Sequence, residues 1–472
     1  MCIGINSDTT SSDIVLINPP SFIEGTLNTQ PIPLGLIFIN RYIAKYGYQS
    51  IIINLADSTS WDDVVERLTK ITHPRIIGIS SYTRQRFSTF ELAALLKLKF
   101  PKTIICLGGP HASFLDKAIL ERKANVDYII RGEGEETFCE LVQQIFSGKI
   151  DDTRSSILGI SYLDKGNVFV SNRYRSQLCD LSILPLPLQT DDELGELILS
   201  DSLKFHFPDS FGDCLRMAPI ITSRGCDGNC SFCCNRAFWG NNRCSNAEYS
   251  YKQFEYYNNK GICYFDVYDD NFTSNSEQVL ELCNMLIRST MNIKWWCSSR
   301  VDTVNLEILE KIKLAGGFMI SYGVESGSQL ILDNISKGVT ITDIESACNL
   351  SKKVGLALRI TISIGHLGEN DATINETIDL INRLQPSQIA IFMLKVYPGT
   401  PIASFLSKKH LLSDDYWFKK KNDIVPFFTY EHTQTKLLEF RDRIIDNIQA
   451  IIVNQYEDEL SSIELDLKWE FA

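Results

Sequence analysis

Short, uninterrupted runs of apolar and β-branched residues recur along the first 150 residues, and they constrain the fold more than any other feature. The runs occupy residues 14–17, 50–54, 76–80, 103–107 and 127–130. Stretches with helical periodicity separate them. Strands without polar alternation are buried on both faces, which is typical of a parallel sheet covered by helices. The sequence therefore predicts a doubly wound, Rossmann-like α/β domain over residues 1–150.

The predicted strands lead into loops that are rich in glycine or in polar residues. These loops are residues 18–20, 80–84, 108–111 and 131–135. Parallel sheets of this type bind ligands at the carboxyl ends of their strands, and glycine lets a backbone approach a large ligand closely. Each loop alone is compatible with a tight strand-to-helix turn. Four such loops on one edge favour a binding site.

The alternating pattern stops after residue 150 and starts again near residue 219. Between these points we expect a connector, residues 151–218, that contains a hairpin with its turn at 164–167. Six further apolar runs follow at 219–223, 262–268, 294–299, 318–324, 356–364 and 388–396. Helical stretches separate them, so we predict a partial (β/α)6 barrel over residues 219–401 with its chemistry at the carboxyl ends of the strands.

The pattern is lost after residue 401. We expect residues 402–472 to form a small, mainly helical region that caps the substrate site. Its segment 415–432 contains aromatic residues at irregular spacing. That composition is compatible with a substrate lid and equally with ordinary packing.

The composition of the whole chain narrows the class of protein. A formal net charge of -12 argues against a nucleic-acid backbone as the main partner. No segment is apolar enough to span a membrane, and the N-terminus lacks the basic and apolar regions of a signal peptide. We therefore expect a cytoplasmic protein. Its 14 cysteines then indicate reduced thiols, some of them metal ligands.

Three cysteines, Cys226, Cys230 and Cys233, follow the first predicted barrel strand in a C-x3-C-x2-C spacing. Thiolates this close together suit an iron–sulfur cluster, because its irons are soft and favour sulfur ligands. A structural zinc ion would need a fourth ligand, for which Cys234 and Cys244 are the nearest thiols in sequence. Zinc and buried unliganded thiols are the alternatives. With three ligands, a [4Fe–4S] cluster keeps one iron open for a small molecule.

The cysteine spacing, with Phe232 before the last cysteine, resembles the radical S-adenosylmethionine (SAM) superfamily. Later segments are similar to that family's barrel in the same order: 264–275, 299–304, 315–338, 362–370 and 396–401. The resemblance implies that the three cysteines hold a catalytic [4Fe–4S] cluster and that SAM is the missing fourth ligand. It also implies SAM contacts by Asp269, Asp270, Glu325, Ser326 and Gly365.

Two points of this resemblance have a second interpretation. Asp269 and Asp270 are equally compatible with helix capping or a turn. The fifth-strand segment departs from the common form at His366 and Leu367, where a hydrophobic residue and a proline are usual.

The first 150 residues resemble the cobalamin-binding domain that precedes many radical SAM barrels. The resemblance implies cobalamin contacts by Ser80, Tyr82, Thr83, Arg84, Gly108, Gly109, Pro110, His111, Arg131, Gly132, Glu133 and Gly134. Classical cobalamin domains carry a D-x-H-x-x-G motif whose histidine ligates cobalt. Here that place reads NPPSFIEG, so the resemblance implies base-off cobalamin without that ligand. His111 is a candidate cobalt ligand, a contact of the nucleotide tail or a turn residue.

Together the resemblances imply a cobalamin-dependent radical SAM enzyme like the class B methyltransferases. The expected reaction methylates an unactivated sp3 carbon of a small molecule or peptide in natural product biosynthesis, through a 5′-deoxyadenosyl radical and methylcobalamin. A flavodoxin or ferredoxin is the expected electron donor. The alternatives are cyclisation, ring contraction or rearrangement without methyl transfer, polar methyl transfer to an sp2 carbon or phosphorus, and a non-catalytic cobalamin or redox sensor.

Overall fold

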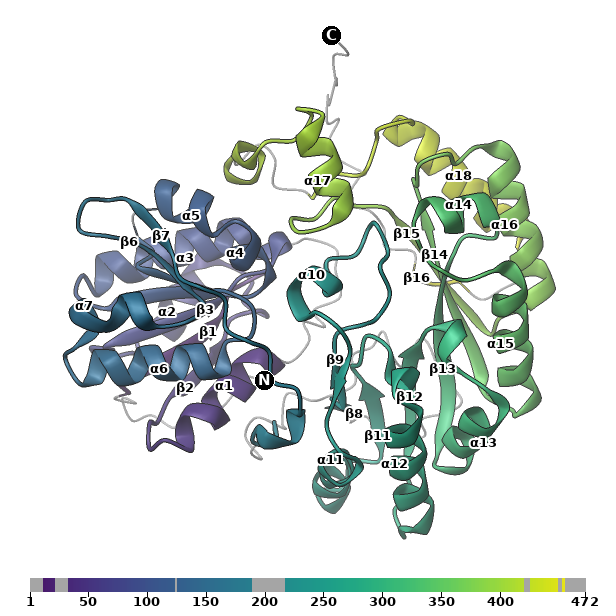
Figure 1. Ribbon diagram of the computed structural model, residues 1–472, viewed down its shortest axis with the longest axis horizontal. Coiled ribbons are helices and arrows are strands. Elements are labelled where there is room, and N and C mark those ends of the chain that lie inside the picture. Colours follow the sequence, from purple (N-terminus) through teal and green to yellow (C-terminus); the bar gives the residue numbers. More distant parts are fainter. Residues whose placement is uncertain are drawn as a thin grey trace.

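The computed structural model describes residues 12–21, 33–123, 125–188, 217–419, 425–448 and 452–454. These residues form two mixed α/β units around two separate seven-stranded sheets. Figure 1 shows the N-terminal unit in purple and blue beside the larger green unit, with helix α10 (Asn235–Trp239) between them. This confirms the predicted α/β fold class for both halves of the chain.

The N-terminal sheet has the strand order β2-β1-β3-β4-β5-β6-β7, and its first five strands in sequence are parallel. The strands are β1 (Ile14–Asn18), β2 (Ile51–Asn54), β3 (Ile76–Ser80), β4 (Ile104–Gly108), β5 (Tyr128–Ile130), β6 (Ile160–Leu163) and β7 (Phe169–Ser171). The helices are α1 (Leu34–Ala44), α2 (Trp61–Leu68), α3 (Arg86–Lys99), α4 (Pro110–Phe114), α5 (Asp116–Arg122), α6 (Glu135–Phe146) and α7 (Ile150–Thr153). All five predicted strands are confirmed.

The apolar strands of this sheet are buried on both faces, as the sequence predicts. Each residue from Ile14 to Ile17 is at most 1% exposed. Alternate residues enter different clusters: Val15 and Ile17 pack on one face, and Ile14 and Leu16 on the other. The absence of polar alternation in the run 14–17 is therefore a direct consequence of helices covering both faces.

The predicted hairpin is confirmed, but it does not belong to a connector. Its turn is fixed by Asp164 Oδ1, which accepts hydrogen bonds from Gly166 N at 2.8 Å and Val168 N at 2.9 Å. β6 pairs antiparallel with β5, so the hairpin extends the N-terminal sheet. The predicted boundary at residue 150 therefore cuts off two strands that hydrogen-bond to this sheet.

The second sheet is entirely parallel, in the order β16-β15-β14-β13-β12-β11-β8. Its strands are β8 (Met217–Ile220), β11 (Tyr264–Val267), β12 (Lys294–Ser299), β13 (Gly317–Glu325), β14 (Ala357–Ile364), β15 (Gln388–Met393) and β16 (Ile452–Asn454). Its helices are α11 (Ala247–Asn259), α12 (Ser276–Arg288), α13 (Leu306–Leu314), α14 (Gln329–Asn334), α15 (Ile341–Lys353), α16 (Asp371–Leu384) and α18 (Gln434–Asn447). The six predicted strands are confirmed, and β8 and β16 lie at the two edges of the open sheet.

The C-terminal region differs from the predicted cap in one respect. It contains α17 (Pro401–Lys408), a 3-10 turn (Asp414–Phe418) and α18, but β16 also adds a seventh strand to the barrel sheet. A three-residue strand is too short to leave a periodic signal. The last residues of the predicted region, 455–472, lie outside the described part of the chain.

The aromatic segment after α17 packs against the N-terminal domain, so the packing interpretation of these residues holds for Trp417. Trp417 is 2% exposed and its ring lies 6.2 Å from that of His111. Phe418 stacks on Phe90 of α3 with ring centroids 5.6 Å apart. None of the described helices has the length and apolar character required to cross a membrane.

Candidate functional site

The three cysteines line one cavity of about 440 Å³. They lie on the loop between the short strand β9 (Ser223–Arg224) and α10. Opposite walls come from the carboxyl ends of β12, β13 and β14 and from α17. Among the lining residues are Ser298, Ser299, Arg300, Ser321, Gly323, Glu325, Lys337, Thr361, Gly399 and Ser404. The predicted location at the carboxyl ends of the barrel strands is thus where the cavity lies.

Backbone amides of the loop point at two of the sulfurs. Gly228 N donates to Cys226 Sγ at 3.3 Å, and Asn235 N donates to Cys233 Sγ at 3.4 Å. Such donors favour thiolates, as do hydrogen bonds to the sulfurs of iron–sulfur clusters. An added Cβ at Gly228 would lie 2.7 Å from Arg300 Nη1 and 3.4 Å from Cys226 Sγ, so a side chain there would displace the Arg300 guanidinium. The loop therefore lies close to Arg300.

Burial opposes ionisation of the thiols. It raises the pKa of Cys233 to about 12. It also raises the pKa of Cys230, against the opposing charges of Lys337 and Arg300. Buried thiols become thiolates readily only beside a strong positive charge, which the irons of a bound cluster supply. The donor set therefore fits an iron–sulfur cluster.

Within the described residues, no group of three or more His, Cys, Asp or Glu side chains is placed to hold a metal ion. Cluster thiolates bind separate irons, so a cluster does not require Cys226, Cys230 and Cys233 to converge on one point. Neither Cys234 nor Cys244 lines the cavity. Cys244 Sγ instead donates to Asn242 Oδ1 at 3.1 Å.

Glu325 and Lys337 form a buried ion pair at the cavity wall. Lys337 Nζ lies 3.1 Å from Glu325 Oε1, and the residues are 6% and 8% exposed. Burial lowers the pKa of Lys337, but the charges of Glu325 and Cys230 outweigh it, so the net shift is upward. Glu325 has φ +67 at a register shift of β13. Such backbone is rare for a residue with a side chain and is typical of functional sites.

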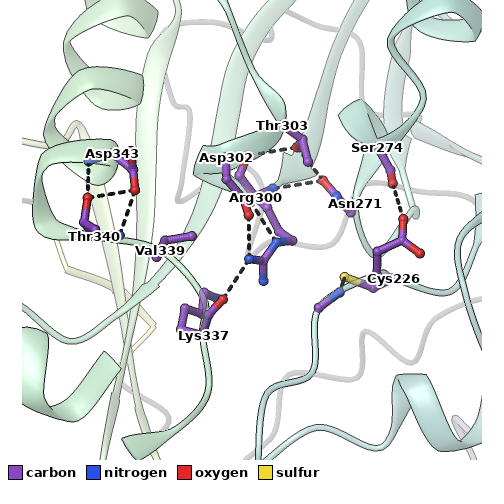
Figure 2. Close-up of polar contacts among 12 residues, drawn as sticks. Cys226, Asn271, Ser274, Arg300, Asp302, Thr303, Lys337, Val339, Thr340 and Asp343 are labelled. Carbon is purple, nitrogen blue, oxygen red and sulfur yellow. Dashed lines mark hydrogen bonds and ion pairs between the residues drawn. The ribbon is translucent and has the colours of Figure 1, made fainter. Parts of the chain in front are cut away.

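Arg300 connects three elements around the cavity (Figure 2). Its guanidinium pairs with Asp302 at 2.8 Å and donates to the Lys337 carbonyl at 2.8 Å. Its backbone N–H donates to Asn271 Oδ1 at 2.9 Å, and Thr303 Oγ1 donates to the same oxygen at 3.1 Å. The network fixes the end of β12 against the loop that carries Lys337.

The structure separates the predicted SAM residues into two groups. Asp270 and Glu325 line the cavity with the cysteines, whereas Asp269, Ser326 and Gly365 do not. Both carboxylate oxygens of Asp269 accept hydrogen bonds, from Thr222 and Ser223. These bonds oppose burial, which raises the pKa of Asp269 to about 6. Asp269 thus joins the segment after β8 to the segment after β11, and its SAM contact stays a prediction.

The other two predicted residues also have internal partners. Ser326 Oγ lies 3.3 Å from Thr377 Oγ1 and is buried. Gly365 has φ +109 and donates its N–H to Glu369 Oε2 at 2.6 Å. Their SAM contacts stay predictions.

The loop after β3 presents its predicted cobalamin residues unequally. Tyr82 is 53% exposed, and Arg84 is exposed. Thr83 is buried and hydrogen-bonds His111 Nδ1 at 3.2 Å. Ser80 Oγ donates to Asn18 Oδ1 at 3.1 Å. Tyr82 and Arg84 are therefore the side chains of this loop that a large ligand can reach.

The loop after β4 is packed tightly onto the loop after β3. Gly109 has φ +96, and an added Cβ would lie 3.0 Å from Ser81 O. The loop begins at Gly108, and Pro110 starts α4. His111 has no exposed area and its ring lies between those of Phe90 and Trp417. The arrangement supports the turn interpretation of His111 and does not present it to a cobalt ion.

The loop after β5 is used largely for internal contacts. Arg131 donates to the carbonyls of Ile160 and Asn172 and is buried. Glu133 forms ion pairs with Arg224 of β9. An added Cβ at Gly134 would meet Ile39 Cδ1 at 3.0 Å.

Gly132 is the open point of this loop. It has φ +71, and an added Cβ would meet no atom within 4 Å. Gly132 and the exposed Tyr82 are therefore the points at which the carboxyl edge of this sheet is accessible.

Sequence reasoning missed Arg300 and Lys337 as individual site residues. Both lie in segments whose resemblance to a barrel was recognised, 299–304 and 315–338. Their roles depend on contacts with each other and with Glu325, which the sequence spacing does not reveal.

Comparison with known proteins agrees with this geometry. The model of the B12 binding domain matches residues 21–142, and the model of the radical SAM superfamily matches residues 220–381. The chain is 28% identical over 427 residues to "Uncharacterized methyltransferase PH0819" of Pyrococcus horikoshii, covering 89% of this chain and 88% of that protein. It is 26% identical to an anaerobic magnesium-protoporphyrin IX monomethyl ester cyclase of Cereibacter sphaeroides, covering 84% and 63%.

Solved structures share the fold at lower identity. The radical SAM methyltransferase TsrM from Kitasatospora setae, bound to tryptophan and a SAM analogue, has a TM-score of 0.69 at 18% identity, covering 84% of this chain and 77% of that one. The cobalamin-dependent SAM radical enzyme OxsB, with aqua-cobalamin and SAM bound, has a TM-score of 0.66 at 22% identity, covering 87% and 56%. Each match spans both the N-terminal domain and the barrel of this chain, which confirms the two-domain fold.

Proposed function

Because the chain belongs to the radical SAM superfamily and carries a B12 binding domain, we propose that it methylates an unactivated sp3 carbon. The substrate class that we propose is a small molecule or peptide. The chain is a cobalamin-dependent radical SAM enzyme, and the proposal concerns the type of carbon and the radical route. Bound together, the cluster, SAM and cobalamin supply one-electron chemistry and a transferable methyl group.

One observation carries this proposal. Cys226, Cys230 and Cys233 line a single cavity with the buried pair of Glu325 and Lys337. The thiols supply a three-ligand set, and the buried pair offers a carboxylate and an ammonium group at the same wall. SAM carries both an amino and a carboxyl group, so charges of each sign at the wall suit its binding.

The chain's own residues also control the surroundings of this cavity. Arg300 holds the end of β12 to the Lys337 loop. Gly399 and Ser404 also line the cavity. In cofactor-dependent chemistry, the protein's main task is to position the reactive groups and to keep water from reactive species.

For cobalamin we propose a base-off mode in which Tyr82 would contact the cofactor. Tyr82 is 53% exposed at the carboxyl end of β3, whereas His111 has no exposed area. The segment after β1 contains no histidine within NPPSFIEG. Electron donation by a flavodoxin or ferredoxin completes the proposal.

Cyclisation is the second candidate function, since one specific observation favours it. The chain resembles magnesium-protoporphyrin IX monomethyl ester cyclases over 84% and 90% of its length in two organisms. Methyl transfer is supported by the similarity to the Pyrococcus protein and by 23% identity to a hopanoid C-3 methylase across 89% of the chain.

The products of SAM cleavage test the two candidates. The protein is reconstituted with iron, sulfide and cobalamin, and SAM and a strong reductant are added. 5′-Deoxyadenosine together with S-adenosylhomocysteine supports methyl transfer, whereas 5′-deoxyadenosine alone favours cyclisation or rearrangement. If neither 5′-deoxyadenosine nor S-adenosylhomocysteine forms, the proposed function is overturned. Replacement of Cys226, Cys230 and Cys233 with Ala should abolish cluster absorbance, whereas Cys234→Ala, beside the loop, should retain it.

A further inference from the structure

Four buried charged side chains join the loop after β5 to the base of the cysteine loop, and we call them the latch. They are Glu133, Glu135, Arg224 and Arg243. Arg224 Nη1 lies 2.8 Å from Glu133, and its Nη2 lies 2.6 Å from Glu135. Arg243 donates to both carboxylate oxygens of Glu133, at 2.9 and 3.1 Å. No side chain of the latch is more than 10% exposed.

The latch is connected rigidly to the first cysteine. A single residue, Gly225, separates Arg224 from Cys226. Gly225 has φ +84, and an added Cβ would lie 2.8 Å from the carbonyl oxygen of Asn241. Asn242 Nδ2 donates to the Gly225 carbonyl at 3.0 Å. A displacement of Arg224 therefore reaches Cys226 without a flexible segment to absorb it.

The other end of the latch lies at the carboxyl edge of the N-terminal sheet. Glu133 lies in the loop between β5 and α6, and Glu135 is the first residue of α6. Gly132, before them, has φ +71 and donates its N–H to Ser113 Oγ at 3.0 Å. This is the same edge that exposes Tyr82. The latch thus links the two edges at which the two cofactors are proposed to bind.

The energetics of buried charges indicate a role in geometry. Burying ions carries a desolvation cost that their attraction does not always exceed, and apolar replacements of a whole buried network are often equally stable. Buried ionic groups are well attested as devices that fix register. Packing also fixes Arg224, whose guanidinium carbon lies 4.6 Å from the ring centroid of Phe38 in α1 and 5.4 Å from that of Trp239 in α10.

We propose that the latch sets the separation between cobalamin on the N-terminal domain and the cluster on the cysteine loop. Glu133 and Arg224 are positioning residues in this device, because they act through the two loops and not on the reacting atoms. This inference rests on the proposed function. It gives Glu133 a role between domains in place of the cobalamin contact that the sequence resemblance implies.

Dipolar electron paramagnetic resonance measures that separation directly. Full-length protein is reconstituted with iron, sulfide and hydroxocobalamin and then reduced with dithionite, so that cob(II)alamin and the reduced cluster each carry an unpaired electron. The variant is Glu133→Gln, which keeps the side-chain shape and removes its charge. The control is Arg67→Gln, which breaks a half-exposed ion pair with Asp57 in the same domain.

We expect Glu133→Gln to retain iron and cobalamin but to give a shifted and broader distance distribution, while Arg67→Gln matches the wild type. An unchanged distribution in a Glu133→Gln protein loaded with both cofactors overturns the inference and leaves the proposed function intact. A wild-type protein that binds neither cofactor overturns the proposed function itself.

If Glu133→Gln does not fold, a second variant tests the same inference. Glu133→Leu combined with Arg243→Met removes charges of both signs together, which buried networks tolerate better than a single loss. The same broadening is expected, and a wild-type distribution in this double variant overturns the inference.

Discussion

The buried imidazole of His111 should make the N-terminal domain less stable in mild acid. Burial, with a contribution from the Arg86 charge, lowers the pKa of His111 to about 3. An unfolded histidine has a pKa of about 6.5. Below pH 6.5 the histidine is protonated in the unfolded chain but stays neutral in the folded domain. The free energy of unfolding therefore falls as the pH falls from neutral toward the folded pKa. Between pH 7 and pH 5 this amounts to roughly 2 kcal/mol.

The substitution His111→Gln removes the titration and keeps a group able to hydrogen-bond Thr83. Its stability should therefore fall by roughly 2 kcal/mol less than that of the wild type between pH 7 and pH 5. Other titrating groups are common to both proteins, so the difference between them isolates His111.

Hydrogen exchange of the β3 and β4 amides, followed by mass spectrometry, reports unfolding of this domain separately from the barrel. Exchange is measured at both pH values and corrected for its intrinsic pH dependence. Equal pH dependence in the wild type and His111→Gln would refute the reasoning, because it would mean that the folded domain protonates His111 as readily as the unfolded chain.

Two further predictions concern the cavity wall. Glu325→Ala should lower the free energy of unfolding by about 3–5 kcal/mol, because it leaves the Lys337 ammonium buried without its partner; a urea-denaturation cycle that adds Lys337→Met should recover most of this loss, and purely additive losses would contradict the coupling. Gly399→Ala should cost about 2–4 kcal/mol, since Gly399 has φ +83 and an added Cβ would lie 2.4 Å from the Phe114 ring. Thermal unfolding tests this second prediction. Adding Phe114→Ala to Gly399→Ala should relieve the collision with the ring but not the backbone strain. If Gly399→Ala alone is as stable as the wild type, α4 does not pack against Gly399.

The strands of both sheets were predictable because their signal is local. The uninterrupted apolar composition of residues 14–17 is enough to predict that they are buried on both faces of the sheet. β16 was not predictable, because three residues give no periodicity and its pairing with β15 is set by tertiary contacts. The same limit applies to the hairpin of β6 and β7, whose turn is evident in the sequence but whose sheet is not.

The candidate site shows a similar division. The cysteine triplet and the segments around it are recognisable from spacing, and Glu325 follows from them. Asp269 and Asp270 are adjacent and chemically identical, yet only Asp270 lines the cavity. Glu133 has the glycine-rich surroundings of a ligand loop, but its partner Arg224 lies 91 residues away. Only such a long-range partner distinguishes a charged residue with a structural role from one that binds a ligand, and the local sequence does not reveal it.

The packing of Trp417 and Phe418 against α3 has a consequence for synthesis of the protein. The N-terminal sheet contains all its strands once Ser171 has left the ribosome, so this domain can fold first. Phe418, which covers Phe90 in the folded protein, is translated only after six of the seven strands of the second sheet, β8 to β15. During that interval the nascent domain exposes the apolar side chain of Phe90, and slow translation of the barrel would prolong its exposure to aggregation.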